Sequence, residues 1–178
     1  GEDVFIRDMR EKIAVNAIGE GRVMMSNIEG DVFANLEDGV LHVENATGTI
    51  HAASKAGVIV LRQIHAAEAV SATFPVEENS AVDAVSTIVA SVNSWGLIDA
   101  SGITGNATFT ANTGDILVEQ VTGRLKATTG IGDIIVDRCE GDLFLYITDK
   151  GNIVATDAHC GECNAETAEG VVDASWIQ

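Results

Sequence analysis

The sequence predicts an all-β fold: a single-domain, right-handed parallel β-solenoid with two short strands in each 18–19-residue coil and about nine coils. Three observations predict it. Glycine recurs every nine residues, from Gly30 to Gly57 and again from Gly96 to Gly141. Counting each glycine as position one, positions three and five are apolar in almost every repeat. Position eight is apolar only in alternate repeats, so the true period is two repeats, and units this short must stack to bury a core.

Each expected strand follows from this numbering. Positions three and five point inward and position four outward, because side chains alternate along a strand. Glycine at position one permits the torsions of a tight corner, and right-handed winding is the default for parallel crossovers. In chain order, the inward pairs include Val4 and Ile6, Ile13 and Val15, Val32 and Ala34, Leu41 and Val43, Ile116 and Val118, Ile134 and Val136, and Leu143 and Leu145.

The two kinds of repeat predict two different corners. One corner turns inward and the opposite corner faces water. The inward corner carries Ile28, Ala46, Ile64, Ile103, Val121, Cys139 and Ala158, whereas the outward corner carries Glu37, Lys55, Asn112, Gly130 and Thr148.

The stretch 66–86 breaks the pattern. Two coils would take about 36 residues between Gly57 and Gly96, but the two glycines are 39 apart. The simple phase would also bury Glu68 and Glu77, which the cost of burying a charge disfavours. We therefore expect an irregular coil with a three-residue bulge or loop at residues 74–79, inside one domain that covers residues 1–178.

Composition excludes several classes of partner. The formal net charge is −17, and an acidic surface repels nucleic-acid phosphates and anionic lipids. No 18-residue apolar run is present that could span a bilayer. We expect no nucleic-acid partner, no direct membrane insertion and no cofactor.

A Gly-Asp-aliphatic step recurs along the chain, at Gly30-Asp31-Val32, Gly114-Asp115-Ile116, Gly132-Asp133-Ile134, Gly141-Asp142-Leu143 and, with Asn in place of Asp, Gly151-Asn152-Ile153. Together with the run Ala-Thr-Thr-Gly-Ile-Gly-Asp-Ile at 127–134, this step resembles the bacterial adhesin-type β-solenoid family called the toastrack domain. The resemblance covers roughly residues 20–65 and 95–175. It implies a domain of the cell envelope or extracellular surface with no established enzymatic activity.

We therefore expect a non-enzymatic binding or adhesion domain with a protein or envelope partner, or a homo-oligomer. The alternative is a self-assembling, bactofilin-like scaffold that stacks end to end. A weaker alternative is a metal-dependent binding module. No Ser/His/Asp or Cys/His/Asn set converges in the repeat scheme, which disfavours an enzyme.

The outward fourth positions are the candidate binding residues. Leu117, Ile135 and Val154 form a stacked apolar column on one sheet. Phe33 and Phe144, with Tyr146 two residues further on, are outward on the other sheet. Such columns could bind a partner or a second copy, although branched side chains also favour strands for structural reasons alone.

A cysteine and histidine cluster is the candidate for a metal site or a disulfide. Cys139 occupies the inward corner of one coil, and His159 and Cys160 reach that corner one coil later, with Cys163 three residues on. Adjacent coils are about 5 Å apart, so Cys139 and Cys160 could form a disulfide. The four residues could also form a Cys3His zinc site, or the thiols could simply pack in the core.

Aspartates also stack beside the glycine corner. Asp115, Asp133 and Asn152 share one face, and Arg124 lies next to Asp142 on the other. This column could bind cations, but Asp more often accepts hydrogen bonds from backbone N–H groups in a turn. We favour the structural interpretation.

Overall fold

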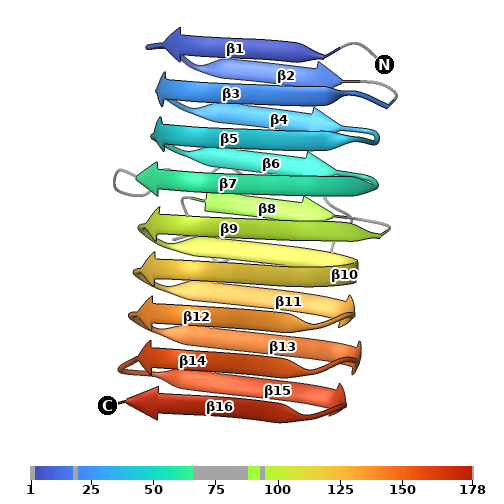
Figure 1. Cartoon of the computed structure of the whole chain (residues 1–178), viewed down its shortest axis with the longest axis vertical. Coiled ribbons are helices and arrows are strands. Elements are labelled where there is room, and N and C mark those ends of the chain that lie inside the picture. Colours follow the sequence, from blue (N-terminus) through green and yellow to red (C-terminus); the bar gives the residue numbers. More distant parts are fainter. Residues whose placement is uncertain (1–2, 18–19, 66–87, 93–94, 178) are drawn as a thin grey trace, which may run out of the picture.

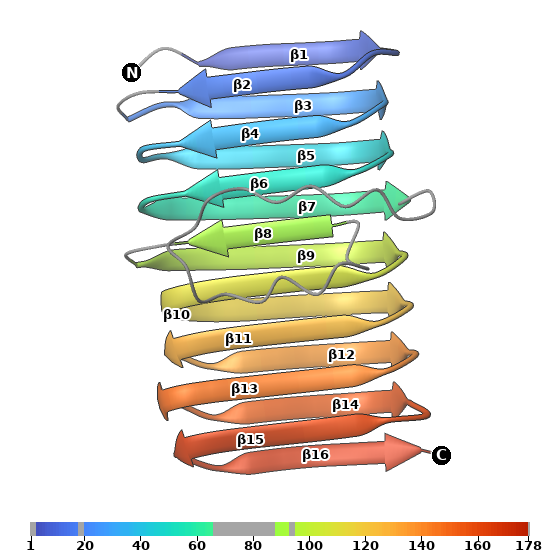
Figure 2. The ribbon, with the colours of Figure 1, turned by 180° about the vertical axis from the view of Figure 1, so that it is seen from behind.

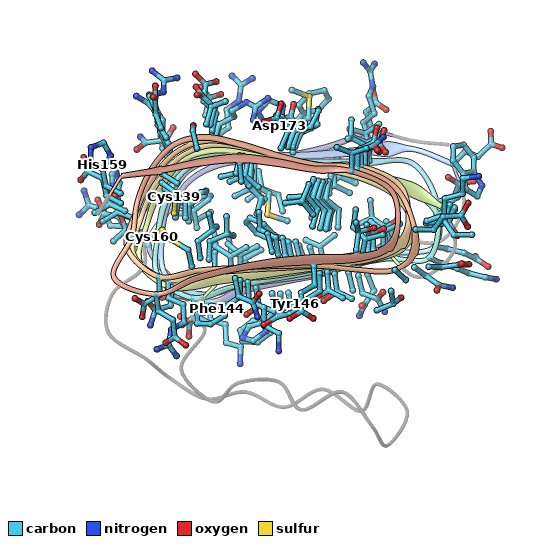
Figure 3. The ribbon with its side chains drawn as sticks, turned by 90° about the horizontal axis from the view of Figure 1, so that it is seen from below. Cys139, Phe144, Tyr146, His159, Cys160 and Asp173 are labelled. Carbon is cyan, nitrogen blue, oxygen red and sulfur yellow. A yellow bond between two sulfur atoms is a disulfide. The ribbon has the colours of Figure 1, made fainter. Side chains whose placement is uncertain are left out.

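The computed structural model describes residues 3–17, 20–65, 88–92 and 95–177. Within these ranges the chain contains strands and no helix, and it winds as a right-handed solenoid with successive coils stacked on one another (Figure 1). Seen along its long axis, each coil is a flattened oval whose two long walls enclose one interior (Figure 3). The predicted fold class is confirmed.

The two walls are parallel sheets, here called sheet A and sheet B. Figure 1 looks onto sheet A and Figure 2 onto sheet B, and β10 (Ala107–Thr122) runs through both. Sheet A contains β1 (Val4–Met9), β3 (Arg22–Glu29), β5 (Val40–Thr47), β7 (Gly57–His65), β9 (Gly96–Thr104), the second half of β10, β12 (Ile134–Glu140), β14 (Ile153–His159) and β16 (Val172–Ile177). Sheet B contains β2 (Ile13–Ala17), β4 (Val32–Leu36), β6 (Ile50–Ser54), β8 (Ile88–Val92), the first half of β10, β11 (Leu125–Ile131), β13 (Leu143–Lys150) and β15 (Cys163–Glu169).

Equivalent repeat positions stack directly above one another in the core. Ile116 pairs with Ile134, and Ile134 pairs in turn with Ile153. Phe109 is fully buried, and its neighbours in the coils on either side, Ala90 and Ala127, are small enough to leave room for its ring. Between the terminal strands, the third-position column of sheet A is at most 1% exposed, and it consists of Val23, Leu41, Ile59, Ile98, Ile116, Ile134 and Ile153. Its end members, the expected inward residue Val4 on β1 and Val172 on β16, are 38% and 41% exposed because no further coil covers them.

The inward corner of sheet A depends on a backbone feature that the repeat pattern did not reveal. The residue at position seven has a positive φ in every coil of sheet A from β1 to β14. A left-handed residue interrupts the alternation of the strand, so position eight points inward and position seven outward. The series is Asp8, Asn27, Asn45, Gln63, Gly102, Gln120, Arg138 and Asp157, with φ between 51° and 64°.

The coil count differs from the expectation. β7 pairs directly with β9, with Gly57 beside Gly96, so these glycines are one coil apart and not two. The described chain therefore makes about eight turns in place of the expected nine. The reason is visible in the sequence: 39 residues separate the two glycines, and a second coil there would have buried Glu68 and Glu77. The expected bulge at residues 74–79 lies outside the described residues.

Close backbone approach explains why the corner next to sheet A is glycine. A Cβ placed on Gly132 would lie 2.2 Å from the carbonyl oxygen of Gly114, and one placed on Gly151 would lie 1.9 Å from that of Gly132. Both glycines also have a φ that other residues rarely adopt, +139° and +154°. Any side chain at this corner would push neighbouring coils apart and break the sheet registers on both walls.

Gly132→Ala should therefore lower the free energy of unfolding by about 1–3 kcal/mol. The matched control is Gly161→Ala, because a Cβ there meets nothing closer than Asp142 Oδ1, at 3.5 Å, which is an ordinary contact distance. Urea titrations followed by far-ultraviolet circular dichroism would measure both midpoints. Equal midpoints for the two variants would contradict this account of the corner.

The position-seven column gives a prediction of opposite sign. Gln63 has a φ of 52°, which is unfavourable for a side chain with a Cβ, whereas Gly102 occupies the equivalent site in the next coil. Gln63→Gly should raise the free energy of unfolding by about 0.5 kcal/mol, because relief of left-handed strain exceeds the loss of chain stiffness. Gly102→Ala should lower it by about 1 kcal/mol. A stabilising Gly102→Ala in the same urea titrations would contradict the assignment.

Candidate binding face

The outer face of sheet A brings together the apolar column that the sequence predicted. Leu117 pairs with Ile135, and Ile135 with Val154, in consecutive coils. Ile135 is 41% exposed, and the other two are half-buried. The three side chains thus form a continuous apolar strip along the solenoid axis.

The strip extends well beyond the three residues that the sequence predicted. Met24, His42 and Val60 occupy the same fourth position in β3, β5 and β7, and Phe5 precedes them on β1. We call the fourth-position residues of sheet A, from Phe5 to Val154, the sheet A column. Its members were identifiable, because each lies three residues after position one of its repeat. Beside it, at position two, lie Val40, Val58 and Leu97.

Asp99 is the one charged member of the sheet A column, and Arg62 neutralises it. The Arg62 guanidinium donates from Nη1 to Asp99 Oδ1 at 2.8 Å and from Nη2 to Oδ2. This hydrogen-bonded pairing raises the pKa of Arg62. The side chains are 31% and 32% exposed, so a fixed ion pair lies in the middle of the apolar strip.

Charge is unevenly distributed along the same face. In the half before β9, Arg22 Nη2 pairs with Asp3 at 2.9 Å, and Arg7 and Glu44 also point outward. In the half after β9 the outward side chains flanking the column are mainly acidic. They are Asp115, Glu119, Asp133 and Asp137, with Arg138 bonded to Glu119 and Asp137.

The aspartate column is a structural clamp between coils. Asp115 Oδ1 accepts the backbone N–H of Asp133 at 2.8 Å, and Asp133 Oδ1 accepts that of Asn152 at 2.7 Å. Asn152 Oδ1 in turn accepts the N–H of Val171 at 3.1 Å. The expected role in backbone hydrogen bonding is confirmed, although the donor belongs to the next coil and not to the same turn.

The aromatic candidates on sheet B do not form one site. Phe33 lies on β4 and Phe144 on β13, separated by β6, β8, β10 and β11. Phe33 stacks on His51 with ring centroids 5.0 Å apart, and burial lowers the pKa of His51. The Lys12 ammonium lies 4.2 Å from the Phe33 ring.

Near the other end of sheet B, polar neighbours already cover the aromatic pair. The Arg124 guanidinium lies 5.7 Å from the Phe144 ring, and Asn164 Nδ2 donates to the Tyr146 hydroxyl at 3.3 Å. Both rings point outward from the wall (Figure 3). Among the residues whose side chains the structure describes, sheet B therefore presents isolated aromatic contacts in a polar surface and no apolar strip like that of sheet A.

The disulfide in the structure is not the Cys139–Cys160 bond that the sequence left open as an alternative. Cys160 pairs with Cys163, with Cα atoms 5.9 Å apart, and Cys139 is free and fully buried. The register explains the difference: Cys139 stacks on Ala158, so Cys160 lies two residues beyond the contact position. Figure 3 shows Cys139 and Cys160 inside the wall.

The Cys3His zinc set, one of the alternatives for this corner, is not assembled in this geometry. His159 points outward from the wall, away from the cysteines (Figure 3), and is exposed. Cys160 and Cys163 bond each other and offer no thiolate. Among the described residues, no group of three or more His, Cys, Asp or Glu side chains is arranged to hold a metal ion.

An open groove of about 380 Å³ lies along the outside of the inward corner. Arg138, Glu140, Asp157 and His159 contribute to its polar lining. The Arg138 guanidinium forms ion pairs with Glu119 and Asp137. The groove follows the left-handed bends of three successive coils, and its titratable groups lie along its walls without enclosing a buried reaction centre.

No family model, curated protein or solved structure matches this chain. The resemblance to the toastrack domain therefore stays a prediction. None of the described residues forms a helix capable of crossing a bilayer.

The thiol chemistry of the corner gives a direct test. Burial raises the pKa of the Cys139 thiol from 9.0 to about 11, and only the thiolate reacts rapidly with maleimide. Native protein at about pH 8 should take up no label at Cys139 within the time in which a free thiol is fully labelled. Mass spectrometry should then find one label after unfolding without reductant, and three after unfolding with reductant.

The same pKa predicts a loss of stability in alkali. Above pH 9 the unfolded chain releases the thiol proton while the folded chain retains it, so stability falls as pH rises from about 9 to about 11. Cys139→Ala should remove this part of the decline.

In the maleimide labelling experiment, three labels on unreduced, unfolded protein would contradict the Cys160–Cys163 disulfide.

Proposed function

We propose that this chain is a non-enzymatic binding domain of the bacterial cell envelope or surface, and that it makes contact through the outer face of sheet A. The observation that carries the proposal is the sheet A column. Its apolar side chains stack in register along the solenoid axis, with His42 and the Arg62-paired Asp99 as the polar members. Contiguous exposed apolar surface of this kind is typical of a protein contact site.

Three further features support a binding role over catalysis. The walls are flat sheets whose outward residues stand on rigid strands, which suits recognition of an extended surface. The groove at the inward corner is open, and its arginine is engaged by neighbouring carboxylates. The polar ladders of Asp115, Asp133 and Asn152 are engaged in holding coils together. The location in the envelope is supported by the Gly-Asp-aliphatic resemblance.

The test is co-sedimentation of purified protein with isolated bacterial cell envelopes. Ile135→Lys places a charge at the most exposed of the three stacked positions Leu117, Ile135 and Val154. It should weaken binding at least tenfold, because a charged side chain is costly to bury in a contact. Thr110→Lys is the matched control: it makes the same charge change at an exposed position on sheet B.

Both variants add one positive charge, so non-specific attraction to anionic envelopes rises equally in the two. A selective loss in Ile135→Lys therefore reports contact through sheet A. Equal binding by the two variants, or no binding by the unaltered protein, would contradict the proposed function.

A further inference from the structure

We infer that the outer face of sheet A binds a second copy of this chain, face to face and antiparallel, about a two-fold axis that runs along the strands through β9. The inference rests on the proposed function in that it takes the same face as the contact surface. It adds the identity of the occupant and the orientation in which it binds.

The spacing of the sheet A column favours another solenoid as the occupant. Its side chains repeat at the separation of parallel strands, about 4.8 Å. A helix offers side chains about 5.4 Å apart and a strand along the axis about 6.6 Å, so either loses register after a few coils. A second stack of rungs has the same repeat and can interdigitate along the whole column, as paired sheets do in dry interfaces.

From Met24 to Val154 the column has three members on each side of Asp99: Met24, His42 and Val60 precede it, and Leu117, Ile135 and Val154 follow it. Phe5, at the β1 end, has no apolar counterpart, because Asp173 takes the equivalent place on β16. The axis also brings Asp99 beside Asp99 of the partner subunit, each carboxylate being held by Arg62 of its own subunit. A two-fold axis through β9 places Val60 against Leu117 of the partner subunit. By the same operation Met24 meets Val154 of the partner subunit. An isologous contact requires this kind of self-complementarity.

The charges select the antiparallel arrangement. It places the acidic half of each face against the less acidic half of the other, with Arg62 opposite Glu119 of the partner subunit. Glu44 lies opposite Asp137 of the partner subunit, which Arg138 of that same subunit neutralises. A two-fold axis along the solenoid would instead place Asp115 opposite Glu119 of the partner subunit and Asp133 opposite Asp137 of the partner subunit, at a cost in like-charge repulsion.

The available area is sufficient for a stable pair. The nine strands of sheet A, spaced by about 4.8 Å, and five residues of each at about 3.3 Å give a face of roughly 40 by 16 Å. Two such faces bury on the order of 1,300 Å² in total, within the range of specific protein interfaces.

Sedimentation velocity of the purified chain, from micromolar to millimolar concentration, tests the contact. We expect a concentration-dependent dimer, with Ile135→Lys weakening association at least tenfold and Thr110→Lys leaving it unchanged. A chain that stays monomeric throughout, or a dimer that resists Ile135→Lys, would overturn the inference. Larger open-ended assemblies would also overturn it, since a two-fold contact closes on itself.

Cysteine cross-linking tests the orientation. Facing sheets lie about 10 Å apart, beyond the reach of a disulfide, so a short bis-maleimide is the reagent. A mixture of His42→Cys and Ile135→Cys chains should cross-link between the two variants, and neither variant should cross-link to itself. Self-linking of Ile135→Cys would instead indicate the parallel arrangement and overturn the inference.

The two experiments separate this inference from the proposed function. Purified protein that stays monomeric, together with envelope binding that Ile135→Lys abolishes, would overturn the second copy as occupant and keep the binding role. A dimer that Ile135→Lys disrupts, together with envelope binding unaffected by that change, would overturn the envelope role of this face and keep the dimer.

Discussion

Neighbouring coils in this protein meet at a corner where two backbones approach more closely than any side chain permits. The carbonyl oxygen of Gly114 lies only 2.2 Å from where a Cβ of residue 132 would stand, and that of Gly132 only 1.9 Å from where a Cβ of residue 151 would stand. The contact sets the phase of each coil relative to the last. Once the phase is set, aliphatic side chains stack in the interior, the parallel ladders close on both walls, and Asp115 and Asp133 can reach the N–H groups of the next coil. The outward side chains of both walls therefore repeat at the same spacing as the coils.

Much of the fold followed from the sequence because the repeat is short and its positions have distinct requirements. Positions three, five and eight report burial, and position one reports the corner. The neighbours Leu117, Ile135 and Val154 could therefore be assigned by counting alone. Counting failed where the repeat is interrupted: Gly57 and Gly96 looked two coils apart and are one. The left-handed bend at position seven also escaped detection, because Asn27 and Asn45 suit such a backbone whereas Gln63, Gln120 and Arg138 give no sign of it.

The candidate site was predicted in part. The fourth-position rule was applied to three residues, although it holds equally for Met24, His42 and Val60. The Arg62–Asp99 ion pair joins residues 37 apart in sequence and became apparent only once β7 was known to pair with β9. The alternative of a Cys139–Cys160 disulfide was wrong because Cys160 lies two residues beyond Ala158, the residue that stacks on Cys139. The repeat locates residues in the strands more exactly than residues at the corners. Cys139 therefore meets Ala158, and Cys160 turns to Cys163.

The direct pairing of β7 with β9 has a consequence for how such a protein can acquire new parts. About twenty residues more than one coil requires separate Gly57 from Gly96, yet the ladder across this point keeps the register seen between uninterrupted coils. The stack therefore tolerates additional chain at a corner without any adjustment of the walls. Each coil contacts only the coils directly above and below it. Segments of other lengths can therefore be inserted between β7 and β9 while the register of the stack is kept. Natural or engineered variants with such insertions can be sought at that junction.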